Sequence, residues 1–264
     1  MDYGIKGETA LVLGGSKGLA FACAQALVEA GVRVAINGRN AADGEAAVAK
    51  LGQVKGGHGA IFIQGDLGEA GKTAAVIDAA RRALGSIHIL VTNAGGPPPG
   101  QFDEHGIDVW RRALEVNMLA AVDAVQRVLP DMKAAHFGRI VNITSFVVKE
   151  PYPNMALSNS IRVALTGAMS TLAREVAGDG ITVNNILPGL MDTGALQRVI
   201  DARVRKQGKT EAQVRDEMAK SIPMQRLGTA EDFGPLCAFL CSKHASYITA
   251  QNITVDGGLV RGLI

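Results

Sequence analysis

The feature that most constrains the fold is a regular alternation of short apolar runs with longer helix-forming stretches along the whole 264-residue chain. Several runs are continuously apolar, as expected for parallel strands that are covered on both faces of a sheet. Strands are predicted at residues 9–13, 32–37, 59–64, 87–92, 139–144, 181–187 and 252–255. Helices are predicted at residues 19–29, 41–50, 70–84, 109–135, 157–177 and 231–240. This repetition indicates the α/β class, with a doubly wound, seven-stranded parallel sheet and helices on both faces.

The chain shows no internal boundary that would separate two folding units. No low-complexity linker interrupts it, and the proline-rich stretch 96–100 is interpreted as a stiff loop after the fourth strand. Residues 192–228 break the alternation, because they are rich in charge and helix formers and follow the sixth strand. Long insertions at the carboxyl end of a strand commonly carry substrate lids. The sequence therefore predicts one nucleotide-binding domain over residues 1–264, with a lid at 192–228.

Composition argues against several classes of function. The net charge is only +2, so the chain has no strong field for a nucleic acid or a membrane surface. No apolar run approaches the ~18 residues of a membrane-spanning helix, and the polar N-terminus does not look like a signal peptide. Cys23, Cys237 and Cys241 make a poor disulfide framework and lack partner ligands for a metal. We expect a cytoplasmic protein with no metal site and no nucleic-acid or membrane partner.

A glycine-rich turn follows the first predicted strand and leads directly into an alanine-rich helix. Its residues are Gly14, Gly15, Ser16, Lys17, Gly18 and Leu19. Glycines let the backbone turn sharply and approach a phosphate, which then binds free amides at the helix N-terminus. In a Rossmann-type sheet this turn holds the pyrophosphate of a dinucleotide, although on its own it can equally be a tight strand-to-helix connection.

The end of the second predicted strand bears on the choice of nucleotide. Asn37 and Gly38 are followed by Arg39, and no acidic residue stands where the ribose hydroxyls of NAD need one. Arg39 and Lys17 are instead suited to neutralise the 2′-phosphate of NADP. The alternative is that both are solvated surface cations. The sequence thus favours NADP(H) over NAD(H) as the cofactor.

Further short motifs fall at the ends of the later strands or in the helices that follow them. They are Asp66-Leu67 after the third strand, Asn93-Ala94-Gly95 after the fourth, Asn117 in the next helix, Ser145 after the fifth, Pro188-Gly189 with Thr193 after the sixth, and Asp256-Gly257-Gly258 after the last. Each alone can be a structural turn, but their joint order along the chain is specific.

Taken together from Lys6 to Gly258, these motifs resemble the short-chain dehydrogenase/reductase family, especially its 3-oxoacyl-[acyl-carrier-protein] reductase-like members. The family's TGxxxGxG loop departs here at Leu13 and Ala20. The resemblance implies that three segments at strand ends bind NADP(H), together with the glycine-rich turn and Arg39. Those segments are Asp66 and Leu67 at the adenine, Asn93 to Gly95, and Pro188, Gly189 and Thr193, of which the last three grip the nicotinamide carboxamide.

Reduction of a carbonyl by a nicotinamide calls for an acid at the carbonyl oxygen. The resemblance implies that Ser145 positions the substrate and that Asn117 holds a water of the proton relay. It places Ser158 and Arg162 where the family has its catalytic tyrosine and lysine. A serine hydroxyl is a poor general acid, and an arginine keeps the positive charge for the nicotinamide ribose without being able to carry a proton. The acid–base equipment is therefore predicted to be non-standard.

Tyr152 offers a possible substitute acid, because it lies seven residues after Ser145 between two prolines. A stiff loop of this kind can present a phenol to a carbonyl, whereas the alternative is an aromatic side chain that only lines the pocket. A basic run in the predicted lid, Arg203, Arg205, Lys206 and Lys209, is either a solvated helix face or a contact for an acidic substrate.

We therefore interpret the chain as an NADP(H)-dependent oxidoreductase that acts on a small carbonyl or hydroxyl substrate. Two alternatives stay open: a nucleotide-binding protein without turnover, acting as a sensor or structural partner, and a non-redox enzyme on the same fold. The resemblance also implies a homo-oligomer, a tetramer or a dimer, joined through the helices predicted at 109–135 and 157–177.

Overall fold

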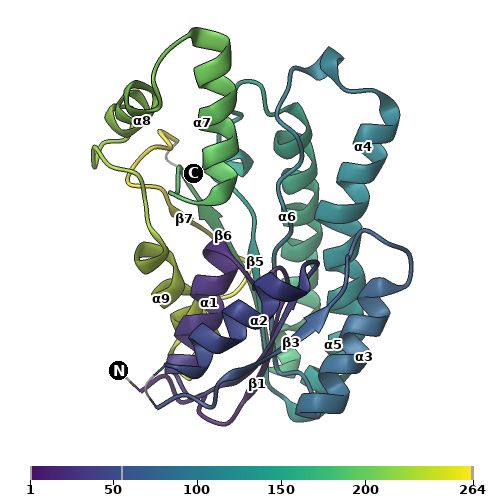
Figure 1. Ribbon diagram of the computed structural model, residues 1–264. Helices are drawn as coiled ribbons and strands as arrows, with labels where there is room; N and C mark the ends of the chain where they lie inside the picture. The colour runs from purple at the N-terminus through teal and green to yellow at the C-terminus, as the bar shows by residue number, and fades with distance from the viewer. Residues whose placement is uncertain (1, 55, 263–264) are drawn as a thin grey trace.

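The computed structural model describes residues 2–54 and 56–262. Figure 1 traces the chain through a single parallel sheet that is flanked by helices. The strands are β1 (Thr9–Val12), β2 (Arg33–Gly38), β3 (Ala60–Gln64), β4 (Ile89–Thr92), β5 (Gly138–Ile143), β6 (Ile181–Pro188) and β7 (Asn252–Val255). The helices are α1 (Gly18–Glu29), α2 (Ala41–Gly52), α3 (Lys72–Leu84), α4 (Ile107–Leu114), α5 (Ala120–Ala135), α6 (Ala156–Val176), α7 (Gly194–Gln207), α8 (Glu211–Lys220) and α9 (Ala230–Cys241).

The order of the strands across the sheet is β3-β2-β1-β4-β5-β6-β7, and all neighbouring pairs are parallel. The chain therefore winds outward in both directions from the junction of β1 and β4. This topology confirms the predicted α/β, doubly wound, Rossmann-type sheet. In such a sheet the ligand crevice lies at the carboxyl ends of the strands where the strand order reverses. The site is therefore expected beside β1 and β4.

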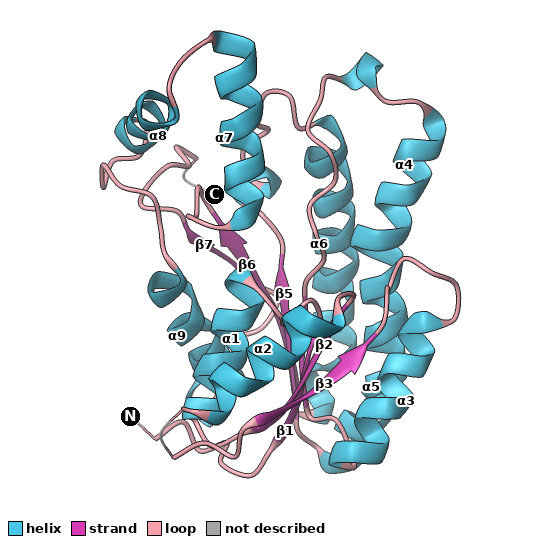
Figure 2. Ribbon diagram, in the orientation of Figure 1, coloured by secondary structure: helices cyan, strands magenta, loops and turns pink. Residues whose placement is uncertain are grey.

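Helices cover both faces of the sheet, as the ribbon coloured by secondary structure shows (Figure 2). Side chains of α1, α2 and α9 pack on one face, and those of α3, α5 and α6 pack on the other. The three cysteines lie in the first of these cores, where Cys23 of α1 meets Cys237 and Cys241 of α9, and all three are fully buried free thiols. The pKa values of Cys237 and Cys241 are raised. The larger cause is hydrogen bonding within this cluster, and the smaller cause is burial.

The prediction of one uninterrupted helix at 109–135 is wrong in detail. The helical path starts at Ile107, and its hydrogen bonding changes to the π type over Glu115–Leu119 before α5 begins. A π-turn accommodates one extra residue inside a helix and is common at functional sites. Boundary shifts elsewhere are small: β4 begins at Ile89 instead of residue 87, and α3 begins at Lys72 instead of residue 70.

A chain of side-chain hydrogen bonds crosses four neighbouring strands inside the sheet. Thr92 Oγ1 donates to Asn142 Oδ1 at 2.6 Å, and Asn142 Nδ2 donates to Asn185 Oδ1 at 3.0 Å. Asn185 Nδ2 then donates to Asn252 Oδ1 at 2.8 Å. These residues are direct register partners on β4, β5, β6 and β7. We call them the polar ladder; each internal member is both donor and acceptor, which satisfies these polar groups away from water.

The segment predicted as a lid forms α7 and α8 and a small apolar core of its own. Leu196 and Ile200 of α7 pack with Val214 and Met218 of α8, and this core includes Phe146, which follows β5. The Met191–Gly228 bridge joins the two ends of the segment. Its role as a lid and the single-domain assignment stay predictions. Within residues 2–54 and 56–262, no helix is long and apolar enough to cross a membrane.

Candidate active site

The glycine-rich turn lies between the carboxyl ends of β2 and β4. Leu13 N–H donates to Val91 C=O, and Gly15 N–H donates to Asn37 C=O, so both neighbouring strands hold the turn. Gly14 has a φ of 62°, and a Cβ there would lie 2.7 Å from Asn93 Nδ2. Glycine is therefore required at this position both by backbone conformation and by the close approach of Asn93.

The N-terminus of α1 is open to an anion. Its N-cap residue, Lys17, makes no side-chain hydrogen bond to the first helical turn, and that turn contains no acidic residue. Lys17 and Gly18 are exposed, and the Lys17 ammonium pairs with Asp43 at 2.8 Å. Unpaired amides at a helix N-terminus and the helix dipole together favour a phosphate. The turn therefore fits the pyrophosphate of a dinucleotide.

The end of β2 lies against the same turn. A Cβ on Gly38 would meet Ser16 Oγ at 2.9 Å, so Ser16 closes over the strand end. Arg39 follows as an exposed residue whose carbonyl accepts a hydrogen bond from Gln64 Nε2 at 2.9 Å. No ion pair engages the exposed Arg39 guanidinium within the described residues, whereas Lys17 is paired with Asp43.

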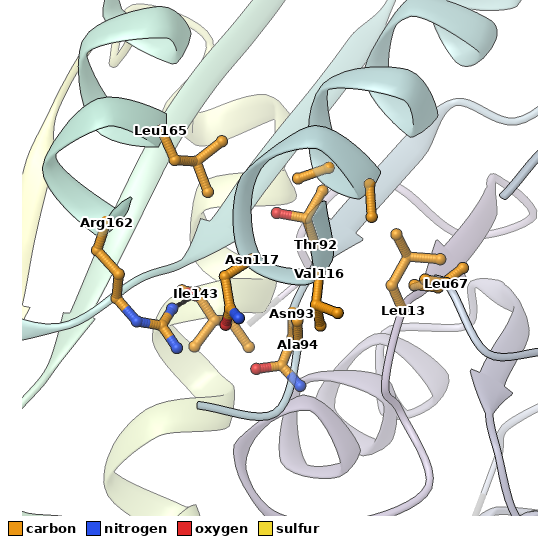
Figure 3. A pocket seen from close by; sticks show the side chains of 12 residues that line it. Leu13, Leu67, Thr92, Asn93, Ala94, Val116, Asn117, Ile143, Arg162 and Leu165 are labelled. Atoms are coloured by element: carbon orange, nitrogen blue, oxygen red, sulfur yellow. Dashed lines mark hydrogen bonds between the residues drawn. The ribbon is translucent and has the colours of Figure 1, made fainter. Parts of the chain in front are cut away.

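A pocket opens at the carboxyl ends of β1, β4 and β5, where the strand order reverses (Figure 3). It brings together side chains that are far apart in the sequence, namely Leu13, Leu67, Thr92, Asn93, Ala94, Val116, Asn117, Ala120, Ala121, Ile143, Arg162 and Leu165. Five of these were predicted as site residues: Leu67, Asn93, Ala94, Asn117 and Arg162. Asp66 lies beside Leu67 and pairs with Arg112 at 3.7 Å.

Arg162 carries the one guanidinium that reaches this pocket among the described residues. It is 8% exposed, and Figure 3 shows its head group extending from α6 toward Ile143 and Asn117. Arg162 Nη1 donates to Ile143 C=O at 3.0 Å. Burial lowers the pKa of Arg162 to about 10, so the side chain stays cationic at neutral pH. Burying a cation that has a single protein hydrogen bond lowers the stability of the fold unless a bound ligand pairs with the charge.

Asn117 lies in the π-turn between α4 and α5 and points into the same pocket (Figure 3). Its Nδ2 donates to Ala113 C=O at 3.2 Å, whereas its buried Oδ1 has no hydrogen-bond partner within the described residues. A buried acceptor without a partner indicates a place for a water or a ligand donor.

Ser145 and Ser158 lie near the pocket without being part of its lining. Ser145 caps the short turn after β5, where its Oγ accepts from Val147 N–H at 3.4 Å. Ser158 is buried on α6, one turn before Arg162, which places both side chains on one face of the helix. Whether these residues act on a substrate stays a prediction.

The segment after β6 faces the glycine-rich turn. A Cβ on Gly18 would lie 3.9 Å from Thr193 Cγ2, so the N-cap residue of α7 lies next to the first residue of α1. Gly189 is held close to the end of β7, because its N–H donates to Val255 C=O and a Cβ there would lie 2.7 Å from Asp256 Cα. The segment that begins with Pro188 and was predicted to bind the nicotinamide thus approaches the turn that was predicted to bind the pyrophosphate.

Tyr152 is held by two residues that sequence reasoning missed in this role. Arg203 Nη2 of α7 donates to Tyr152 Oη at 2.9 Å. Asn159 of α6 bonds both backbone groups of Tyr152, with Oδ1 accepting from its N–H at 3.4 Å and Nδ2 donating to its C=O at 3.1 Å. No sequence motif marks Asn159. Arg203 stood out only as part of a basic run.

Comparison with known proteins gives matches over nearly the whole chain. A family model described as enoyl-(acyl carrier protein) reductase matches residues 14–260. The NADPH-dependent reductase BacG of Bacillus subtilis is 31% identical over 256 residues, which cover 97% of this chain and 99% of that protein. The 3-oxoacyl-[acyl-carrier-protein] reductase FabG of Staphylococcus epidermidis is 30% identical, with 96% and 98% covered. The structure of L-sorbose reductase from Gluconobacter frateurii, complexed with NADPH and L-sorbose, gives a TM-score of 0.94 at 28% identity and covers 100% of both chains.

Proposed function

Because the chain belongs to the short-chain dehydrogenase/reductase family, we propose that it is an NADPH-dependent oxidoreductase that acts on a small carbonyl or hydroxyl substrate. The observation that carries the proposal is the buried Arg162 guanidinium beside the unpartnered Asn117 Oδ1, in a pocket at the strand reversal. The names of the relatives support the same reading, since BacG is an NADPH-dependent reductase and L-sorbose reductase was solved with NADPH.

The residues fit the cofactor on structural grounds. The cradle formed by Gly14 leaves no room for a side chain, and the uncapped N-terminus of α1 accepts the pyrophosphate. Ser16, Gly18 and Leu19 complete that turn. We assign Asp66, Leu67 and Asn93 to Gly95 to the adenosine half, and Pro188, Gly189 and Thr193 to the nicotinamide half. When bound, the reduced nicotinamide supplies a hydride equivalent.

Arg39→Ala is expected to weaken NADPH binding about tenfold while changing NADH binding less than about twofold. The reason is that Arg39 is an exposed guanidinium without an acidic partner within the described residues, whereas Lys17 is already paired with Asp43. Fluorescence titration with each nucleotide measures the two dissociation constants. Equal losses for NADPH and NADH would contradict the assignment of Arg39 to the 2′-phosphate.

We further propose that the acid–base equipment differs from that of the family. Ser158 stands where the family has its tyrosine, and Arg162 where it has its lysine. Arg162 holds the nicotinamide ribose hydroxyls through charge-assisted hydrogen bonds, but it does not release a proton at neutral pH. Ser145 fixes the substrate oxygen, Asn117 Oδ1 holds a water, and Tyr152 supplies the proton that Ser158 cannot.

The test is NADPH consumption by the purified protein across ketones, 3-oxoacyl thioesters and enoyl thioesters, with saturation of the cofactor site established first. We expect steady oxidation with at least one class, and about a tenfold lower kcat/KM for Ser145→Ala because one hydrogen bond to the substrate oxygen is lost. Ser160→Ala is the matched control, since Ser160 is exposed and, among the described residues, its hydroxyl bonds only Ala156 C=O of its own helix.

The second candidate is a nucleotide-binding protein without turnover, and one observation favours it. The chain has only three tyrosines, and none has a lysine four residues later, so the usual acid of the family is missing. Tight NADPH binding with no oxidation across the panel would favour this candidate. Conversion of a substrate without net oxidation of the cofactor would instead favour a non-redox enzyme.

We also propose a single domain with residues 192–228 as its substrate lid, a cytoplasmic location, and a homo-oligomer, either tetramer or dimer. The three free thiols fit a reducing compartment.

The helices expected at the subunit interface carry apolar side chains that are exposed in one copy, namely Ile107, Leu114, Leu119 and Val163. Such residues on neighbouring helices favour burial against a second copy.

A further inference from the structure

The phenol of Tyr152 is fixed from three directions, although it lies in an irregular loop. Its ring packs edge-on against Phe146, the residue after Ser145, with ring centroids 5.4 Å apart. Asn159 bonds both its backbone N–H and its C=O. Arg203 donates to its hydroxyl oxygen. A side chain that merely lines a pocket does not need this number of specific contacts.

The two amide bonds from Asn159 link Tyr152 to the helix that carries the site. Asn159 is adjacent to Ser158 and lies less than one turn before Arg162 on α6. An amide side chain that both accepts from and donates to one residue fixes the position and the orientation of that residue's backbone. The loop is therefore tied in register to Ser158 and Arg162.

The hydrogen bond from Arg203 determines what the phenol can still do. A phenol oxygen accepts and its O–H donates. Because Arg203 has only protons to give, Tyr152 Oη must act as the acceptor in this contact, which leaves its own proton available to another oxygen. No carboxylate lies within ion-pair distance of Arg203 among the residues described, so its charge is directed at the phenol.

Arg203 belongs to the lid, whereas Tyr152 belongs to the loop after β5. The two share the small apolar core in which Ile200 and Leu196 of α7 meet Phe146, with Tyr152 packed at its edge. The hydrogen bond therefore exists only when α7 is docked against that loop. A donor assembled in this way is complete only while α7 is docked against the loop.

We propose that Arg203 and Asn159 are positioning residues that hold the Tyr152 phenol as the proton donor to the substrate oxygen. The inference rests on the proposed reductase function. In the step, the hydride equivalent that bound NADPH would supply forms the new C–H bond at the carbonyl carbon and leaves the oxidised cofactor, the C=O π bond breaks, and the carbonyl oxygen takes the phenol proton. The phenolate left behind is stabilised by the Arg203 guanidinium and regains a proton from water.

The test compares Tyr152→Phe, Arg203→Gln and the double variant with wild type, at saturating NADPH and with the best substrate of the panel. We expect kcat to fall ~100-fold for Tyr152→Phe, as for loss of a general acid. For Arg203→Gln we expect a fall of ~10-fold in kcat, with KM changed less than about twofold. The double variant should be no slower than Tyr152→Phe alone, because both changes act on one donor.

Three controls separate this role from a purely structural contact. Arg203→Lys keeps a cationic donor and should recover most of the lost kcat. Asn159→Asp keeps the acceptor for Tyr152 N–H and loses the donor to its C=O, so a smaller fall in kcat is expected. Arg198→Gln removes an exposed charge five residues earlier on the same helix, outside the basic run, and should leave kcat unchanged. The NADPH dissociation constant and the melting temperature, measured for every variant, should stay close to wild type.

The outcomes distinguish the inference from the function on which it rests. If wild type binds NADPH and reduces no substrate, the proposed function fails and this role fails with it. If wild type turns over but Tyr152→Phe or Arg203→Gln keeps the wild-type kcat, only the inference is overturned. Independent, multiplicative losses in the double variant, or a loss in Arg203→Gln that follows a lower melting temperature, would also overturn it.

Discussion

Arg162→Met is expected to make the apoprotein more stable by about 2 kcal/mol and to lower kcat/KM by ~1000-fold. At neutral pH the guanidinium is charged in the folded and the unfolded protein, and burial lowers its pKa to about 10. The fall from the ordinary value corresponds to roughly 3 kcal/mol of unfavourable burial. That cost is present throughout the neutral range and is relieved only as the pH rises through about 10. Loss of the hydrogen bond to Ile143 C=O offsets about 1 kcal/mol of the gain.

Thermal and urea unfolding of the ligand-free protein measure the stability, and a rise in melting temperature of roughly 5 °C is expected. Arg174→Met on the same helix is the matched control; Arg174 is exposed, so its loss should not stabilise. Arg162→Lys should retain more of the NADPH affinity than Arg162→Met. A less stable Arg162→Met protein would show that the charge is needed by the fold and not reserved for a ligand.

Asn142→Leu is expected to reduce the free energy of unfolding by about 3 kcal/mol, although the two side chains are similar in size. Asn142 is fully buried at the centre of the polar ladder. Its loss leaves the Thr92 hydroxyl without an acceptor and Asn185 Oδ1 without a donor, both inside the sheet. Unpaired buried polar groups each cost about 1–3 kcal/mol. The melting temperature should fall by roughly 10 °C.

A variant at the end of the polar ladder is the control for Asn142→Leu at its centre. Asn252 is half-buried on the edge strand β7, and Asn252→Ala leaves one buried group without a partner, Asn185 Nδ2, against two for Asn142→Leu, so it should cost only about 1 kcal/mol. Adding Thr92→Val to Asn142→Leu removes one of the two unpaired groups and should restore part of the lost stability. Equal losses for Asn142→Leu and Asn252→Ala would indicate that the side chains act individually and not as a connected ladder.

The elements of this fold were predictable because each strand and helix has a local pattern of its own. Continuous apolar runs, such as the one at residues 87–92 that contains β4, identify buried parallel strands. The glycine-rich turn identifies the strand before it, β1, as the first strand of the Rossmann-type sheet. The convergence of Leu67, Asn93, Asn117 and Arg162 on one pocket followed from their places at or after strand ends. The structure confirms the sheet and lines one pocket with these four residues, whereas their binding and catalytic roles stay predictions.

What the sequence did not reveal depends on contacts between distant residues. The polar ladder requires Thr92, Asn142 and Asn185 to share one register, and the register of parallel strands is fixed by packing, not by local sequence. An asparagine in the middle of an apolar strand was the available signal. The π-turn at Asn117 adds one residue to a helix, and its residues Glu115–Leu119 include no glycine or proline that would mark the irregularity. The contact of Arg203 with Tyr152 joins residues 51 positions apart.

The buried thiol cluster has a consequence for how this molecule can be followed in solution. Cys23, Cys237 and Cys241 have no exposed surface, and the raised pKa values of Cys237 and Cys241 keep both thiols protonated. An alkylating reagent therefore reaches them only when α1 and α9 separate. The alkylation rate therefore measures how often α1 separates from α9. Since α1 begins at the glycine-rich turn, the same separation would open the nucleotide cradle, and no engineered label is needed to follow it.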